Sequence, residues 1–249
     1  MRKKSVQNII SLAVALALWQ GAAMLLNKPL LFASPVEVIA RLFSIYKEPL
    51  FFKSIISSLL NIALGFVLGL FIAFMLGALA GKYGFFEIML RPYVTAIKTV
   101  PIASFIILAL LWISPERLSV SIAFLIVFPV VYQNTLEGLR SVEKELIHMA
   151  RVFKVPAKRR IKMLYLPKMK PYILSAASSA SGMAWKAGVA AELIGRPDFS
   201  LGAMLYEAKI YINTADLFCY TLVIIFLSRI FEKAMLYILK RLIGGKYAA

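Results

Sequence analysis

The stretch that decides the fold covers residues 54–80, SIISSLLNIALGFVLGLFIAFMLGALA. It contains no charged residue and is longer than the roughly 20 residues that an α-helix needs to cross the hydrocarbon core of a bilayer. Gly65, Gly69, Ala73 and Gly77 recur at every fourth position, so they share one face of that helix. A ridge of small residues predicts close packing against another helix. Lining of a pore is the alternative function for this ridge.

Further apolar stretches of similar length lie on both sides of this one, and short charged segments separate them. We expect them at residues 8–26, 93–113, 119–135, 172–193 and 217–239. The 249-residue chain is 61% hydrophobic and 16% charged, whereas a soluble domain is about half apolar and about a quarter charged. The alternating ten-residue segments of a membrane β-barrel are not seen. The sequence therefore predicts an all-α, polytopic membrane protein with about six transmembrane helices.

The N-terminal quarter of the chain carries two distinct features. Residues 8–26 follow a basic start, which predicts a transmembrane helix, although a cleaved signal peptide has a similar pattern. Ser34 and Pro35 can begin a second helix, with serine as cap and proline in the first turn. Its apolar residues fall on one face, so we expect it to lie on membrane lipid outside the cytoplasm. We divide the chain into residues 1–53 and a core transmembrane domain, 54–242.

The basic residues concentrate on one side of the predicted membrane. If the N-terminus is cytoplasmic, residues 1–4, 136–171 and 240–246 face the cytoplasm, and they hold most of the lysine and arginine. Such an excess in short loops marks the cytoplasmic side. We therefore expect a multi-pass protein of the bacterial inner membrane with both termini in the cytoplasm. This placement explains the net charge of +17 without a nucleic acid partner.

The loop 136–171 is too long for a simple connector. We expect two short helices there, at 143–153 and 156–164, with Pro156 at the start of the second. Pro167 and Pro171 would end the loop before the fifth span. A helical elbow at the cytoplasmic face predicts a docking element for another protein. Anchoring to anionic lipid is the alternative, because the loop is strongly basic.

The fifth span is more polar than the others. Ser175, Ser178, Ser179, Gly182 and Lys186 recur at helical spacing, so they share one face. A lysine inside a membrane segment usually faces a cavity or a partner. The face is therefore a candidate translocation path for an anion. A packing face with a lysine near a helix end is the alternative.

Three other residues within or beside the spans require an explanation. Lys98 is a second basic candidate for the translocation path. Pro101 is either a hinge within the third span or the start of a helix, because proline removes a backbone donor. Glu192 is the one acidic residue within spans three to five, and we expect it near a span end, where long side chains reach the interface.

The chain lacks residues that nucleotide hydrolysis, metal binding and most enzymatic mechanisms require. It contains no G-x-x-x-x-G-K-[ST] phosphate loop. Cys219 is the only cysteine and His148 the only histidine. No catalytic residue, no metal site and no cofactor of its own is therefore predicted, and an intramembrane enzyme is disfavoured.

Several short motifs occur in a characteristic order. Residues 149–151 (MAR), 155–156 (VP) and 164–167 (LYLP) follow one another in the cytoplasmic loop. This order resembles the coupling motif E-A-A-x-x-x-G, with L-P further along, of ATP-binding-cassette (ABC) importer permeases. Residues 98–101 (KTVP) resemble their [KR]-[ST]-[IV]-P segment, and residues 134–138 (NTLEG) their N-T-x-x-G. Residues 184–192 (AWKAGVAAE) look like the nitrate, sulfonate and taurine branch.

The resemblance covers residues 34–242 and implies the type I permease fold. It implies a path formed by two permease chains, either two copies of this one (a homodimer) or two related chains. It also implies two ATPase subunits that bind ATP below them and an external solute-binding protein. The solute would be a small anion such as nitrate, a sulfonate or taurine. Carried over by position, the residues that couple to the ATPase are His148, Met149, Ala150, Arg151, Lys154, Val155 and Pro156.

Two positions depart from the family pattern. His148 stands where the motif has glutamate, and Lys154 stands where it has glycine. Glycine adopts positive φ without steric cost. Lys154 must therefore accept a strained turn or shape the elbow differently.

An ion-coupled secondary transporter is the alternative function. Such proteins usually contain internal repeats and interrupted helices with ionisable residues at the midplane. The sequence shows no convincing repeat, and this favours the importer.

Overall fold

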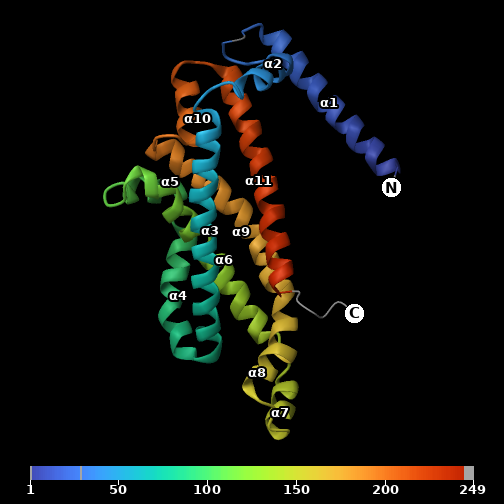
Figure 1. Ribbon diagram of the computed structural model, residues 1–249, viewed down its shortest axis with the longest axis vertical. Helices are drawn as coiled ribbons and strands as arrows, with labels where there is room; N and C mark the ends of the chain where they lie inside the picture. Colours follow the sequence, from blue (N-terminus) through green and yellow to red (C-terminus); the bar gives the residue numbers. More distant parts are fainter. Residues whose placement is uncertain (1, 29, 244–249) are drawn as a thin grey trace.

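The computed structural model describes residues 2–28 and 30–243, and every regular element in that part of the chain is helical. The elements are α1 (Arg2–Leu26), α2 (Pro35–Ile45), α3 (Phe51–Lys82), α4 (Gly84–Thr99), α5 (Ile102–Ala109), α6 (Pro115–Arg140), α7 (Lys144–Val152), α8 (Ala157–Arg160), the π-helical turn η1 (Ile161–Tyr165), α9 (Leu166–Gly195), α10 (Leu201–Ile210) and α11 (Thr214–Ile243). Long helices follow the long axis of the molecule (Figure 1). We name its two ends the α10 end and the elbow end, after α10 and the elbow of residues 141–165.

The length and hydropathy of the described helices show which of them could cross a membrane. α3 and α6 are each long and apolar enough to cross one unaided, and α4 with α5 meets the same criterion as a bent pair. α9 and α11 have 30 residues each. At 1.5 Å per residue they extend about 45 Å, well beyond a hydrocarbon core of about 30 Å. The apolar part of α1, Ala13–Leu26, is shorter than the 18 residues that this criterion requires.

The third predicted span, residues 93–113, is wrong as a continuous helix. The chain leaves the helical conformation at Val100, and α4 and α5 meet there at an angle of 103°. A residue that precedes proline is disfavoured in the α conformation, and Val100 is extended, with φ −71° and ψ 129°. Pro101 is thus the N-cap of α5, so of its two predicted roles the structure shows the helix start.

α6 lies at the centre of the helix bundle. It packs against α3 on one side and α9 on the other, and α11 covers α9. The main core cluster includes Ile62, Phe66, Val127 and Trp185, all 1% exposed or less. These side chains come from all three central helices, so α3, α6 and α9 form one packed unit.

Small residues of α3 line its contact with α6. A Cβ added at Gly65 would overlap the carbonyl oxygen of Val120. A Cβ at Gly69 would lie 2.9 Å from the Cβ of Val127, which is closer than real Cβ contacts. Ala73 is fully buried between them and Gly77. The α3 backbone therefore approaches α6 as closely as it does because these side chains are small.

The loop predicted at residues 136–171 is shorter in the structure. α6 continues to Arg140, and α9 begins at Leu166 instead of residue 172. Pro167 lies in the first turn of α9, where a missing N–H costs nothing. Pro171 is tolerated inside the helix. The second short helix of the elbow consequently runs through η1 directly into α9.

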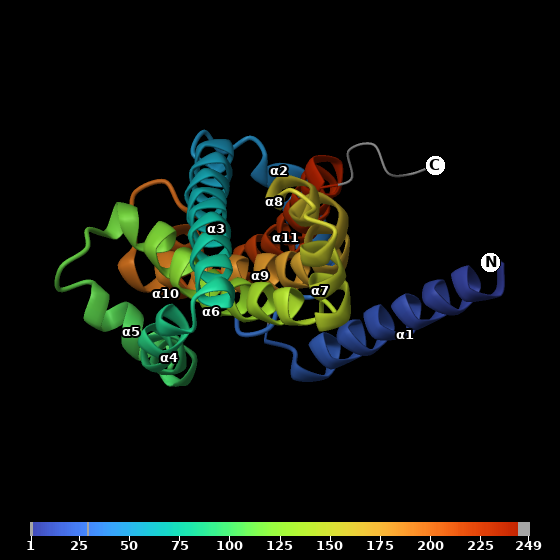
Figure 2. The same ribbon diagram turned by 90° about the horizontal axis from the view of Figure 1, so that it is seen from below.

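The N-terminal elements sit at the α10 end. α1 diverges from the bundle (Figure 2). Its Trp19 ring packs on the ring of Phe218 in α11, with the two ring centroids 5.1 Å apart. Ser34 caps α2 through a capping box, as its sequence predicts. The predicted apolar residues of α2, among them Val36 and Phe43, are exposed and free to contact lipid.

We predict that Gly65→Ala destabilises the protein by about 1–3 kcal/mol, because the new methyl group must displace a helix backbone. The matched control is Gly21→Ala in α1, where a Cβ would meet nothing within 4 Å. Thermal unfolding in detergent, followed by size-exclusion fluorescence, compares the two. Equal melting temperatures for both variants would show that the α3–α6 contact tolerates a larger residue.

Candidate functional site

The elbow turns at Lys154, which has φ 49°. The N–H of Val155 donates to the carbonyl oxygen of Ala150 at 2.9 Å, and the N–H of Lys154 donates to the carbonyl oxygen of Arg151 at 2.9 Å. These two bonds define a Schellman motif, which ends a helix with one left-handed residue. Lys154 thus adopts the conformation that glycine would adopt, and of the two predicted outcomes the structure shows the strained turn.

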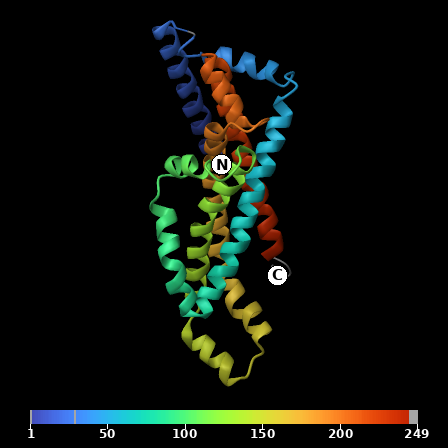
Figure 3. The ribbon, with the colours of Figure 1, turned by 90° about the vertical axis from the view of Figure 1, so that its left-hand side faces the viewer.

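The elbow exposes apolar and basic side chains together. It projects beyond the turn between α3 and α4 (Figure 3). Met149, Val152 and Phe153 are 56%, 77% and 73% exposed. His148, Arg151, Lys154 and Pro156 are exposed beside them, whereas Ala150 is buried. Apolar side chains this exposed on a projecting turn are typical of a protein contact.

Two ion pairs fix the base of the elbow. Lys168 of α9 pairs with Glu143 at 3.0 Å, at the entry to α7. Arg140 at the end of α6 pairs with Glu87 of α4. Both pairs are partly exposed and individually weak. One connects the start of the elbow to α9, and the other connects the end of α6 to α4.

The polar face of α9 is largely open in a single chain. Ser175, Ser179 and Lys186 are exposed, and a Cβ at Gly182 would meet nothing within 4 Å. Ser178 differs from the others, because its hydroxyl donates to Glu232 of α11 at 2.8 Å. The structure thus places four of the five predicted residues on one accessible strip and turns the fifth toward α11.

Lys98 of α4 has a hydrogen-bond partner outside this strip. Its ammonium group donates to Gln133 of α6 at 2.8 Å. α4 packs on α3 and α6, whereas α5, after the break at Pro101, packs on α9. The structure gives Lys98 a partner on α6 and no bond to the strip of α9.

Glu192 of α9 is fully buried, at 0% exposure, so the predicted interfacial position is wrong. The hydroxyl of Ser58 on α3 donates to its carboxylate at 2.7 Å, and the N–H of Gly202 at the start of α10 donates at 3.3 Å. Ser58 also accepts the N–H of Leu201 at 2.9 Å. One carboxylate therefore joins α3, α9 and α10.

The packing around Glu192 leaves space only for small neighbours. A Cβ at Gly202 would lie 2.5 Å from the backbone nitrogen of Leu193. The hydroxyl of Ser119 on α6 also interacts with the Glu192 carboxyl group. Because buried polar groups need such partners, this cluster is a polar junction within otherwise apolar packing.

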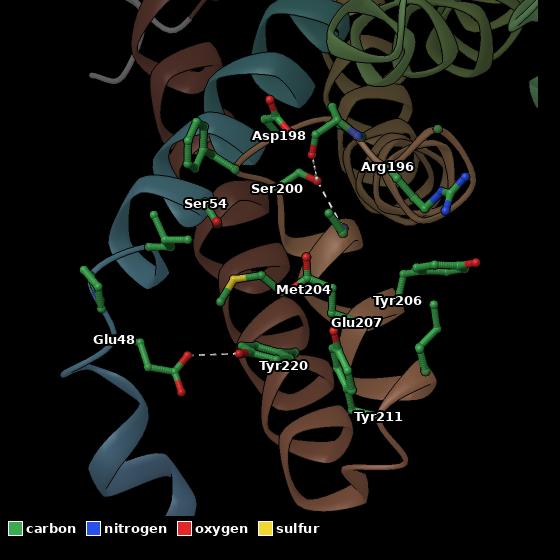
Figure 4. A pocket seen from close by; sticks show the side chains of 17 residues that line it. Glu48, Ser54, Arg196, Asp198, Ser200, Met204, Tyr206, Glu207, Tyr211 and Tyr220 are labelled. Carbon is green, nitrogen blue, oxygen red and sulfur yellow. Dashed lines mark hydrogen bonds between the residues drawn. The ribbon is translucent and has the colours of Figure 1, made fainter.

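A cavity of about 710 Å³ opens at the α10 end (Figure 4). Its walls come from the segment before α3, the loop between α9 and α10, α10 itself and Tyr220 of α11. The charged residues that line it are Glu48, Arg196, Asp198 and Glu207. Aromatic side chains of Phe199, Tyr206 and Tyr211 share the lining.

An ion-pair network supports one wall of this cavity. Arg41 of α2 binds Asp216 at the start of α11 and Glu48 before α3. The hydrogen bond with Asp216 and the nearby Glu48 carboxylate raise the pKa of Arg41 above its ordinary value, although desolvation opposes them. Tyr220 donates to Glu48 at 3.2 Å. The network holds α2, α3 and α11 together.

Sequence reasoning missed the Glu192 junction and the cavity. Glu192 had been noticed as a charge, and two serines at span positions, Ser58 and Ser119, could have suggested its partners. The cavity left no signal, because its residues come from segments far apart in the chain.

Comparisons with known proteins show what the sequence is similar to. The family described as binding-protein-dependent transport system inner membrane component matches residues 65–243. A putative aliphatic sulfonates transport permease protein, SsuC of Bacillus subtilis, is 31% identical over 210 residues, covering 83% of this chain and 75% of that protein. The nitrate import permease protein NrtB of Synechococcus elongatus is 26% identical over 211 residues, 80% of this chain and 75% of that protein. The bicarbonate transport system permease protein CmpB of the same organism is 26% identical over 159 residues, 63% and 57% of the two chains.

We predict that Glu192→Ala lowers the stability of the protein by about 1–3 kcal/mol, because Ser58 and the Gly202 N–H lose their acceptor. Glu192→Gln retains a carbonyl oxygen for these donors and offers an amide to Ser119, so it should retain most of the stability. Thermal unfolding in detergent measures both. A glutamine variant as unstable as the alanine variant would mean that the junction needs a charge.

Proposed function

The chain belongs to the family of binding-protein-dependent transport system inner membrane components, and we propose that it forms the membrane path for a small anion. As a member, it is the membrane-spanning permease subunit of an ABC importer and works with an ATPase and a solute-binding protein.

We propose that the elbow end faces the cytoplasm, together with both termini. Ten of the 29 lysine and arginine residues lie in residues 136–171 at that end, among them Lys158, Arg159 and Arg160. Positive charge in short loops is retained on the cytoplasmic side. The α10 end, with its cavity, then faces outward and meets the solute-binding protein.

The elbow is the proposed contact with the ATPase, and its exposed apolar tip is the observation that carries this proposal. Lipid anchoring needs basic residues near the headgroups. The elbow instead projects beyond the bundle and exposes Val152 and Phe153 at its tip. ATP is bound by the partner subunit, because this chain lacks a phosphate loop. No catalytic step and no cofactor is assigned to this chain.

The accessible strip of α9 is the proposed translocation path. Lysine and serine side chains facing lipid would be costly, so Lys186, Ser175 and Ser179 require an aqueous space or a partner. A second copy of the chain, facing the first across that space, supplies both. We therefore propose a homodimer with the two α9 strips opposite each other and two ATPase subunits below.

The solute is proposed to be an anion. The names of three relatives specify aliphatic sulfonates, nitrate and bicarbonate, all of which are small anions. Lys186 supplies a positive charge on the proposed path, and a charge of one sign in a narrow site concentrates ions of the other sign. Nitrate, a sulfonate or a taurine-like compound fits this charge.

We predict that Val152→Asp abolishes copurification of the ATPase, because a charge would enter an apolar contact. Val152 lies at the tip and is 77% exposed, so the substitution should leave the fold intact. The matched control is Lys154→Gly. Glycine adopts the left-handed conformation without the steric cost of about 1–2 kcal/mol that lysine has there, so this variant should retain the ATPase. Native mass spectrometry of the tagged complex counts the subunits. A Val152→Asp complex of unchanged composition would contradict docking through the tip.

We predict that Lys186→Ala reduces uptake of the anion about tenfold, and that Lys186→Arg retains most of it, because the effect depends on charge. The measurement is uptake of labelled sulfonate or nitrate by proteoliposomes that contain the ATPase and the binding protein. ATPase activity is measured in parallel to show that the complex is intact. Equal uptake by the alanine and arginine variants would remove Lys186 from the path.

A further inference from the structure

The cavity at the α10 end has an excess of acidic groups. Glu48 is already shared between Arg41 and Tyr220. Asp198 and Glu207, both exposed, have no ion-pair partner within the described residues. The one basic residue of the lining, Arg196, is stacked on the ring of Tyr206 at 4.8 Å. Two carboxylates in the wall therefore remain available to a cation.

Aromatic side chains accompany these carboxylates. Tyr206 and Glu207 are adjacent on α10, and Tyr211 lies at its end (Figure 4). A guanidinium or ammonium group binds favourably to an aromatic face and to a carboxylate. The wall contains one such contact already, since Arg196 lies over Tyr206. The cavity thus has the chemistry of a site for a cationic side chain.

The rim of the cavity favours a protein over a small solute. Ile210, Tyr211 and the neighbouring Ile212 are 56%, 80% and 56% exposed. Exposed aromatic and aliphatic residues around a pocket are typical of a protein contact. A volume of about 710 Å³ admits long side chains together with part of their backbone.

The wall formed by the loop between α9 and α10 is held in a defined shape. Arg196 and Phe199 both have positive φ, 51° and 53°. Ser200 caps α10 and also donates to the carbonyl of Pro197 at 3.1 Å, while Lys53 lies 3.3 Å from the ring centre of Phe199. Non-glycine residues hold such φ values only where the surroundings impose them. A preformed wall lowers the entropic cost of binding.

We propose that this cavity receives an arginine or lysine side chain of the solute-binding protein when that protein docks at the α10 end. The inference rests on the proposed function, which places this end outside the cytoplasm. The acidic lining also separates the docking cavity from the solute path, because carboxylates repel the anion that Lys186 attracts. The cavity therefore contacts the carrier of the solute and not the solute.

The test uses the complete complex in nanodiscs, with ATPase activity measured against the concentration of the solute-binding protein. The double variant Asp198→Lys/Glu207→Lys should raise the half-maximal concentration tenfold or more, because like charges at a contact are strongly unfavourable. Glu207→Gln should give a smaller rise. The control is Lys209→Glu, an exposed residue of α10 that does not line the cavity, and it should cause no rise.

The outcomes distinguish this inference from the proposed function. Basal ATPase activity and subunit composition report whether the importer is intact, and both should be unchanged in the variants. An unchanged half-maximal concentration in an intact double variant overturns the cavity as a docking site and leaves the importer standing. A glutamate introduced for a basic residue of the binding protein should restore the double variant. If the double variant does not fold, the Glu207→Gln variant alone tests the proposal. A half-maximal concentration of the solute-binding protein identical to that of the wild type would then overturn it.

Discussion

The close contact between α3 and α6 is the constraint on which the rest of the structure depends. Lipid offers little hydrophobic driving force between helices, so the helices of the bundle associate through close packing. Gly65 and Gly69 let the two backbones approach, and α9 then packs on the opposite side of α6. The position of α9 sets both the accessible polar strip and the buried Glu192. The candidate path therefore depends on residues that have no chemistry of their own.

The two ends of the bundle use contrasting contacts. At the elbow end, a Schellman turn at Lys154 presents exposed apolar residues among basic ones. At the α10 end, carboxylates and tyrosines surround a cavity, and the Arg41 network holds one wall. Close to this end, Glu192 joins α3, α9 and α10. Since α9 runs from the elbow to this junction as one helix, a movement at one end can reach the other without an intervening flexible segment.

The departures from the family motif have a physical explanation at one position. Lys154 adopts a left-handed conformation and makes both hydrogen bonds of the turn. The elbow is thus built by its backbone pattern, and glycine is favourable there without being required. His148 is exposed on α7, and no contact within residues 2–28 and 30–243 explains why it replaces an acidic residue.

Sequence alone determined the all-helical membrane class, the small-residue ridge of α3, the cap at Ser34 and the elbow with its turn near Lys154. These follow from local composition and spacing, which need no knowledge of neighbouring helices. The break of the third span at Val100 has a local cause in the proline that follows, which the sequence marked as a hinge or a helix start. Only the tertiary structure decided that α9 begins at Leu166 and that Ser178 turns toward Glu232. It also decided the burial of Glu192 and the formation of the acidic cavity. The physical reason is that burial and cavities arise where segments distant in the chain meet, and no local pattern records which segments those are.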